Sequence, residues 1–171
     1  FPSTKFFGLL MAKELEAIDK VLRSGERPVT AILGGSKVST KITIIENILP
    51  AVDNLIIGGG MSFTFIKALG GNIGNSLLEA DKMDLALEIL EKAKQHNVKV
   101  FLPVDVVVAD DFSNDADRQE VDIYHIPEGW QGMDAGSKTR EIFHDVIMNS
   151  RTILWNGPIG VFEMENFSAG T

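Results

Sequence analysis

Three short apolar runs in this sequence each end directly in a glycine-rich segment. Residues 29–33 run into Gly34-Gly35, residues 55–57 into Gly58-Gly59-Gly60, and residues 152–155 into the segment 156–160. Runs this continuously apolar are typical of parallel strands that are buried on both faces of a sheet. Because open α/β sheets bind ligands at the carboxyl edge of their strands, we expect the three glycine segments to form one site. Each segment taken alone is equally explained as a tight turn.

Helix-like patterns separate these strands. Helices are predicted over 9–24, from Ser36 or Ser39 to about Leu49, and over 61–69, 82–95 and 137–149, the last capped by Ser137 or Thr139. Further strands are predicted over 98–102 and 104–109, with an edge strand over 121–126, and irregular structure over 72–79, 110–120 and 127–136. The alternation of strands and helices predicts an α/β fold, a three-layer α/β/α arrangement around a mostly parallel, doubly wound, Rossmann-like sheet.

The composition limits the classes of function open to the chain. Its 171 residues suffice for one domain with a core, and the absence of cysteine excludes a disulfide framework or a cysteine nucleophile. The net charge of −8, with no basic stripe, argues against nucleic-acid binding. No apolar run approaches the ~18 residues that span a bilayer. The first residues lack the order of a signal peptide, so we expect no membrane partner and a cytoplasmic location.

Two lysines after the first glycine turn are the clearest concentration of positive charge. Lys37 and Lys41 are four residues apart, so a helix beginning near Ser36 would place both on one face, where they repel each other. A phosphate group between them would relieve this repulsion. A strand, a tight turn and a helix N-terminus form a common phosphate site. A solvated basic face is the alternative.

Neither common nucleotide fingerprint is present. The order Gly-Gly-Ser-Lys differs from that of the P-loop, and Phe63 stands where a glycine would complete a dinucleotide fingerprint in the second glycine segment. This disfavours a nicotinamide-dependent dehydrogenase.

Several other residues receive an interpretation from their position. Glu163 follows the third glycine segment, where its carboxylate could accept both hydroxyls of a ribose or remain a surface charge. Trp155 ends a strand and is predicted to lie in the core. The acidic segment 110–117 lacks the spacing of a calcium loop and is predicted to be solvated. Further core residues are predicted at Met61, Phe63, Phe65 and Ile66.

The chain resembles the phosphoglycerate kinase family along essentially its whole length. The most specific segments are Gly34-Gly35-Ser36-Lys37-Val38 and Trp155-Asn156-Gly157-Pro158. Further matching segments follow in the order and at the spacing of that family, within 34–41, 57–61, 74–77, 102–105, 129–134 and 155–163.

The resemblance implies an enzyme of two α/β domains joined by a hinge, which moves a phosphoryl group between ATP and 3-phosphoglycerate in glycolysis. Residues 1–28 resemble a hinge-proximal segment and helix, and residues 29–171 an incomplete nucleotide-binding domain. The family's N-terminal domain and its Gly-Gly-Gly-Asp segment are absent. We therefore expect the chain alone to be inactive and 3-phosphoglycerate to be bound by the absent domain.

The same resemblance implies roles for residues of the predicted site. Lys37 corresponds to the catalytic lysine that stabilises the transferring phosphoryl group, and Lys41 to the lysine that holds the nucleotide phosphates, with Asn156 nearby. Glu163 corresponds to the residue that binds the ribose hydroxyls. Mg²⁺ is expected on the phosphates of ADP or ATP, and no residue here is assigned as a metal ligand. The residues implied to line the adenine pocket or to lie beside it are Gly35, Ser36, Gly59, Gly60, Leu77, Gly132, Met133, Pro158 and Val161.

A second hypothesis is a non-catalytic domain that binds an anion or a protein partner at the same sheet edge. The two hypotheses differ in the length of the native protein, since the kinase is expected to be much longer than this chain. The full-length kinase is expected to be a monomer.

Overall fold

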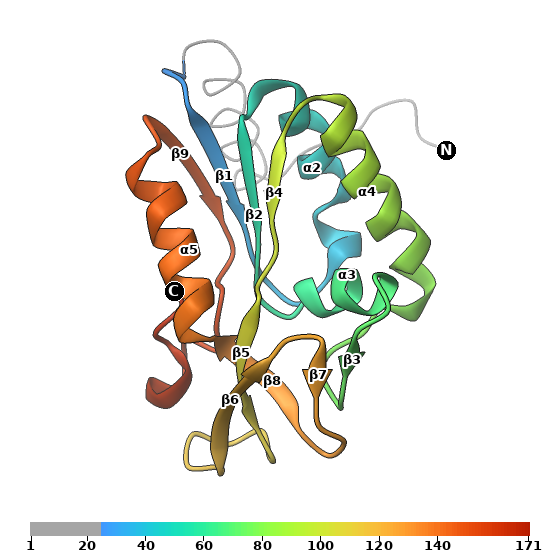
Figure 1. The fold of residues 1–171 in the computed structure, drawn as a ribbon, viewed down its shortest axis with the longest axis vertical. Coiled ribbons are helices and arrows are strands. Elements are labelled where there is room, and N and C mark those ends of the chain that lie inside the picture. Colours follow the sequence, from blue (N-terminus) through green and yellow to red (C-terminus); the bar gives the residue numbers. More distant parts are fainter. Residues whose placement is uncertain (1–24) are drawn as a thin grey trace, which may run out of the picture.

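A parallel sheet forms the centre of the computed structural model, which describes residues 25–171. All three neighbouring strand pairs in this sheet are parallel (Figure 1). The strand order is β4 (Lys99–Phe101), β2 (Asn54–Ile57), β1 (Val29–Leu33) and β9 (Thr152–Asn156). The predicted strands at 29–33, 55–57, 98–102 and 152–155 are therefore confirmed. The helix predicted over 9–24 lies outside the described residues.

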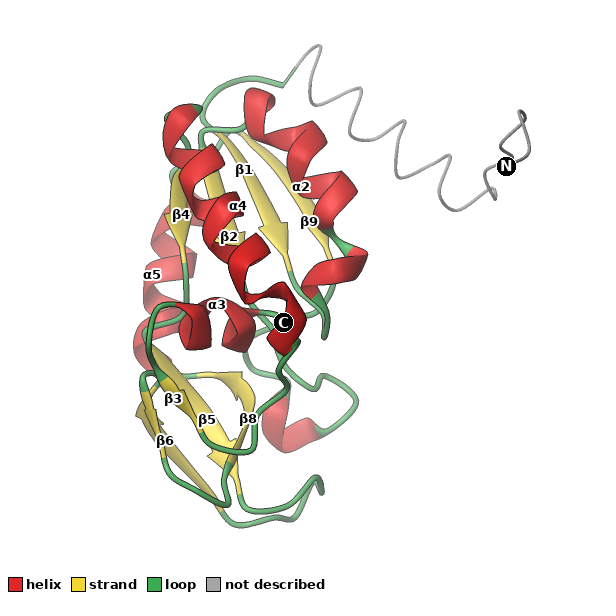
Figure 2. Cartoon of the chain, turned by 90° about the vertical axis from the view of Figure 1, so that its right-hand side faces the viewer, coloured by secondary structure: helices red, strands yellow, loops and turns green. Residues whose placement is uncertain are grey.

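Helices cover both faces of this sheet. Helices α2 (Ile42–Ile48), α3 (Ser62–Ala68) and α4 (Met83–Gln95) lie on one side, and α5 (Ser137–Met148) lies on the other (Figures 1 and 2). The three-layer α/β/α prediction is confirmed. None of the helices among residues 25–171 is long and apolar enough to cross a bilayer.

Alternate residues of β1 and β2 pack into different layers, which explains why these two strands are mostly apolar. Leu33 and Leu55 belong to the cluster that includes Phe65 and Ile89 of the α3 and α4 side. Ile32 and Ile56 belong to the cluster that includes Phe143 of α5 and its neighbours. Because both faces are buried, all of β1 and residues 55–57 of β2 are shielded from water.

The helix predicted after the first strand is interrupted. A 3₁₀ turn, η1 (Val38–Thr40), precedes α2, and Lys37 before it is extended, with φ −133° and ψ 128°. The prediction that Lys37 and Lys41 share a helix face is therefore wrong. Neither Ser36 nor Ser39 caps the helix. The hydroxyl of Thr40 donates to the carbonyl of Lys37 at 2.9 Å, a local bond that competes with regular helix.

The remaining strands form smaller sheets beside the parallel one (Figure 2). Without a helix between them, consecutive strands pair antiparallel through short connections. Strands β6 (Arg118–Asp122), β5 (Asp105–Ala109) and β8 (Gln131–Ala135) form a three-stranded sheet, and β3 (Asn72–Ile73) pairs in parallel with β7 (His125–Ile126). The strand at 104–109 is confirmed, whereas the predictions of irregular structure over 127–136, 110–120 and 72–79 are wrong where β8, β6 and β3 lie.

The core predictions hold with one exception. Met61, Phe63, Phe65 and Ile66 are all buried. Trp155 is 48% exposed, so its assignment to the core is wrong. Its strand, β9, lies at the end of the strand order in the described sheet, and the indole N–H of Trp155 donates to the carbonyl of Gly157 at 2.8 Å.

Asp105 of β5 caps helix α5 from another element. Its carboxylate accepts hydrogen bonds from the amides of Thr139 (2.8 Å) and Lys138 (3.0 Å). The hydroxyl of Thr139 in turn accepts from the amide of Asp105 at 3.0 Å. The residue before the helix is Gly136, and no side chain of the helix caps its own end, so the predicted Ser137 or Thr139 cap is wrong. Asp105 thus joins the antiparallel sheet to the α5 layer.

We expect Asp105→Asn to lower the free energy of unfolding by about 1–2 kcal/mol at neutral pH, because the NH₂ group of Asn cannot accept one of the two amide hydrogen bonds that the carboxylate accepts. Burial opposes ionisation of Asp105, but hydrogen bonds from Thr139 and Lys138 outweigh it and lower the pKa of this carboxyl below its ordinary value of 3.8. A lowered pKa contributes stability above pH 3.8 that is lost as the pH falls through the folded-state pKa. Urea titrations across this range measure the difference.

The matched control is Asp117→Asn, since Asp117 is exposed in the turn between β5 and β6. Its free energy of unfolding is expected to match that of the parent protein at every pH. An Asp105→Asn variant with an unchanged free energy of unfolding at neutral pH would contradict the capping role.

Candidate functional site

The three glycine segments meet at one edge of the parallel sheet. The amides of Gly34 and Gly35 donate to the carbonyls of Asn156 (3.0 Å) and Pro158 (2.9 Å), which joins the first turn to the third. The carbonyl of Gly35 accepts from the amide of Met61 at 2.9 Å, which joins the first turn to the second. The prediction that these segments form one edge is confirmed.

Two of these glycines are required by the closeness of the turns. A Cβ atom on Gly34 would lie 2.0 Å from the carbonyl oxygen of Pro158. Gly59 has a φ of +67°, and its Cβ would lie 2.7 Å from the amide nitrogen of Gly35. Backbone meets backbone at both positions, so no side chain fits without moving a turn.

A cavity of about 330 Å³ opens beside these turns, between them and the antiparallel sheet. Its volume lies within the range of small-molecule sites in proteins. Ten of the residues named from the sequence line it, namely Gly35, Ser36, Gly59, Gly60, Leu77, Gly132, Met133, Pro158, Val161 and Glu163.

Two aromatic residues that were not assigned to the site also line the cavity. Phe63 was predicted as core, and its ring fills the space that Gly132 leaves open, since a Cβ there would lie 2.0 Å from Phe63 Cζ. Phe112 is 60% exposed at the turn between β5 and β6. In the sequence, Phe112 could have been recognised because it is a large aromatic residue within an acidic, polar turn.

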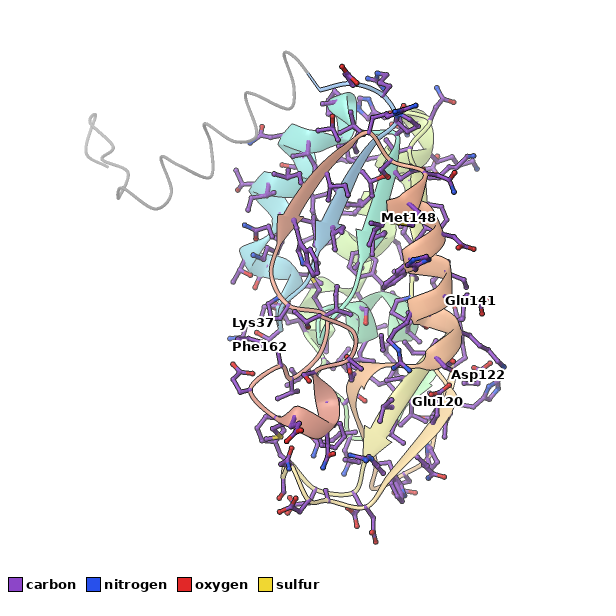
Figure 3. The ribbon with its side chains drawn as sticks, turned by 90° about the vertical axis from the view of Figure 1, so that its left-hand side faces the viewer. Lys37, Glu120, Asp122, Glu141, Met148 and Phe162 are labelled. Carbon is purple, nitrogen blue, oxygen red and sulfur yellow. The ribbon has the colours of Figure 1, made fainter. Side chains whose placement is uncertain are left out.

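The lysines and Asn156 lie outside the cavity lining. The ammonium of Lys41 donates to the side-chain oxygen of Asn156, and Lys41 Cε lies 3.9 Å from the place a Gly35 Cβ would take. Lys41 therefore lies over the first turn and reaches the third. Lys37 is exposed and lies near the end of β9, on a different part of the surface from Glu141 and Met148 of α5 (Figure 3).

A buried carboxylate, Asp134, joins the end of β8 to Gly170 near the end of the chain. Asp134 is 4% exposed and accepts hydrogen bonds from the amides of Ala135 (2.8 Å) and Gly170 (3.0 Å). Burial raises the pKa of Asp134, although these amides and the charge of Arg140 act in the opposite direction. Asp134 also lines the cavity, and its position in the 129–134 segment was the only sequence signal for it.

The charged side chains that line the cavity are the carboxylates of Asp105, Asp134 and Glu163. Within residues 25–171, no three His, Cys, Asp or Glu side chains gather in a way that could hold a metal. Lys41 lies outside this lining, over the first glycine turn, and Glu163 is exposed. The arrangement can accept a ligand with a flat apolar part and a charged end.

A parallel sheet with a cavity at its glycine-rich carboxyl edge defines a ligand-binding domain of the open α/β class. The family model for phosphoglycerate kinase matches residues 1–171. The chain belongs to the phosphoglycerate kinase family.

Curated and structural relatives agree. The phosphoglycerate kinase of Porphyromonas gingivalis is 56% identical over 167 residues, which are 98% of this chain and 40% of that protein. The phosphoglycerate kinase structure from Coxiella burnetii has a TM-score of 0.88 at 46% identity, covering 96% of this chain and 42% of its own. The Pyrococcus horikoshii structure has a TM-score of 0.75 at 32% identity with the same coverage. The chain thus spans less than half the length of these relatives.

We expect Gly34→Ala to lower the free energy of unfolding by roughly 3 kcal/mol, the upper end of the usual cost of overpacking. The added methyl group would meet the backbone oxygen of Pro158, which cannot move without separating the turns. Gly58→Ala is the matched control, because its methyl group would meet a side chain rather than backbone, with Ile159 Cδ1 nearest at 2.6 Å. We expect it to cost about 1 kcal/mol. If urea titrations gave the two variants equal losses in the free energy of unfolding, the claim that the backbone contact between the turns is rigid would be contradicted.

Proposed function

We propose that these residues form the ADP- and ATP-binding part of a phosphoglycerate kinase. The enzyme would transfer the terminal phosphoryl group of ATP to the carboxylate of 3-phosphoglycerate, giving 1,3-bisphosphoglycerate and ADP, and would run in reverse in glycolysis. The observation that carries the proposal is one cavity at the glycine edge, lined by residues from all three turns, with Lys41 lying over the first turn.

The cavity supports the binding of the adenine and ribose. Its walls include Leu77, Met133, Pro158 and Val161, apolar side chains suited to a flat base. Glu163 at the rim would accept hydrogen bonds from the ribose hydroxyls, as a carboxylate does with two neighbouring donors. The ring of Phe63, which packs against Gly132, would add to this apolar surface.

The turns and lysines support the binding of the phosphates. Lys41 and Asn156, which already bond each other, would hold the phosphates of ADP at the edge of the sheet. Lys37 would stabilise the charge that spreads over the phosphoryl group during transfer. Phosphoryl transfer depends mainly on alignment and charge neutralisation, so it needs no covalent partner in the protein. Mg²⁺ would be held mainly by the phosphates themselves.

The remaining parts of the reaction are assigned to residues outside this chain. The chain spans 40% of its curated relative, and none of its residues is assigned to 3-phosphoglycerate. We infer that the 171 residues alone do not turn over this substrate. We place the full-length enzyme in the cytoplasm as a monomer without a nucleic-acid or membrane partner.

The binding of MgADP to the full-length protein tests the proposed site. We expect Lys41→Ala to weaken binding by roughly 10–100-fold, because a hydrogen bond to a charged group contributes about 1.5–3 kcal/mol. Glu163→Ala should weaken it by about 10-fold, since it removes the acceptor for the ribose. Isothermal titration calorimetry measures both affinities.

The control is Lys138→Ala, which removes an exposed lysine on α5. This variant should bind MgADP as the parent does. The same affinity in all four proteins would rule out the assignments of Lys41 and Glu163.

A further inference from the structure

A short strap, residues 76–79, contacts the second glycine turn, β8 and η1. It has no regular secondary structure and runs between β3 and the 3₁₀ turn before α4. The sequence resemblance assigns only Leu77 within it. Its other contacts connect the nucleobase cavity to the turn that carries the lysines.

The first half of the strap is fixed to the walls of the cavity. The hydroxyl of Ser76, which is 8% exposed, accepts a hydrogen bond from the amide of Gly132 at 2.9 Å. The side chain of Leu77 covers Gly60, since a Cβ on that glycine would lie 2.7 Å from Leu77 Cδ1. The position of the strap is therefore set by its contacts with both β8 and the second glycine turn.

The second half of the strap is fixed to η1. The carboxylate of Glu79 accepts hydrogen bonds from the amide of Ser39 at 3.1 Å and from its hydroxyl at 2.5 Å. The amide of Glu79 donates to the hydroxyl of buried Thr64 at 3.2 Å, which anchors this end of the strap on α3. Ser39 lies midway between Lys37 and Lys41, so Glu79 holds the centre of the segment that carries both lysines.

The charge of Glu79 suits this holding role. Partial burial and the nearby Asp81 favour the neutral acid, but hydrogen bonds from Ser39 and from the amide of Val38 outweigh them and lower the pKa of Glu79. The carboxylate is therefore ionised at neutral pH and supplies acceptors to the start of η1. That turn has no side-chain cap of its own.

We propose that Glu79 is a positioning residue: by holding Ser39 from the strap that also carries Leu77, it sets where Lys37 and Lys41 lie relative to the nucleobase cavity. This inference rests on the proposed function, because it assumes that the lysines act on the phosphates of a nucleotide bound in that cavity. Glu79 itself does not touch the nucleotide. If the carboxylate of Glu79 faced the nucleotide, its negative charge would repel the phosphates.

The test compares the full-length parent with Glu79→Gln, which keeps the shape of the side chain but removes its charge and one acceptor. Three quantities are measured: kcat, the affinity for MgADP and the affinity for adenosine. We expect kcat to fall about 5–10-fold and MgADP to bind about 3–10-fold more weakly. Adenosine affinity should stay within about twofold, because adenosine has no phosphate for the lysines to hold.

Two further variants separate positioning from a general loss of structure. Ser39→Ala should reproduce the effects of Glu79→Gln, and the double variant should be no worse than the more affected single variant, because both act through one contact. Glu91→Gln removes an exposed carboxylate on α4, and it should match the parent in kcat and in both affinities. Should a variant fold poorly, its adenosine affinity would fall with its MgADP affinity, and this joint loss would overturn the proposal.

The outcomes also distinguish this inference from the proposed function. A parent protein that binds no MgADP and transfers no phosphoryl group would remove the proposed function itself. A parent that does both, with a Glu79→Gln variant of equal kcat and MgADP affinity, would overturn only the role of Glu79. Additive effects in the double variant would overturn it as well.

Discussion

The close approach of the first and third strand-end turns is the constraint on which the site depends. Backbone hydrogen bonds from Gly34 to Asn156 and from Gly35 to Pro158 extend the pairing of β1 and β9 beyond the sheet, and no side chain fits between the turns. Lys41 lies over Gly35 and bonds Asn156, so the position of its charge follows from this contact. The cavity begins at the same turns, which gives the proposed phosphate and base sites a common backbone reference.

The antiparallel sheet forms the opposite wall of the cavity and is held there by side chains that accept amide hydrogen bonds. Asp105 caps α5, Asp134 binds Gly170, and Ser76 binds Gly132. Each bond joins elements that are far apart in the sequence. Within residues 25–171, no buried side-chain polar atom lacks a hydrogen-bond partner. Such fully satisfied polar contacts fix one arrangement of two sheets whose apolar packing alone would allow several.

The sequence was sufficient where a local pattern determined the structure. The strand over 29–33 could be predicted because burial on both faces makes four of its five residues apolar, and α4 because its apolar stripe is long. The pattern was insufficient where distant partners decide: β8, rich in glycine and polar residues, becomes a strand only by pairing with β5. Ten cavity-lining residues were identified through the resemblance, whereas Asp134 and Glu79 depend on contacts with Gly170 and Ser39 that no spacing encodes.

The most direct test of this account is a titration of the isotope-labelled, full-length protein with MgADP, followed through backbone amide chemical shifts. We expect the largest changes in amide chemical shift in the three glycine segments, 34–41, 58–60 and 156–163, together with Gly132 and Met133. A second hollow lies at the opposite, amino-terminal end of the parallel strands, around Asp53 and Asn97. Shifts confined to that end, or no saturable shifts at all, would contradict the claim that the glycine edge binds the nucleotide.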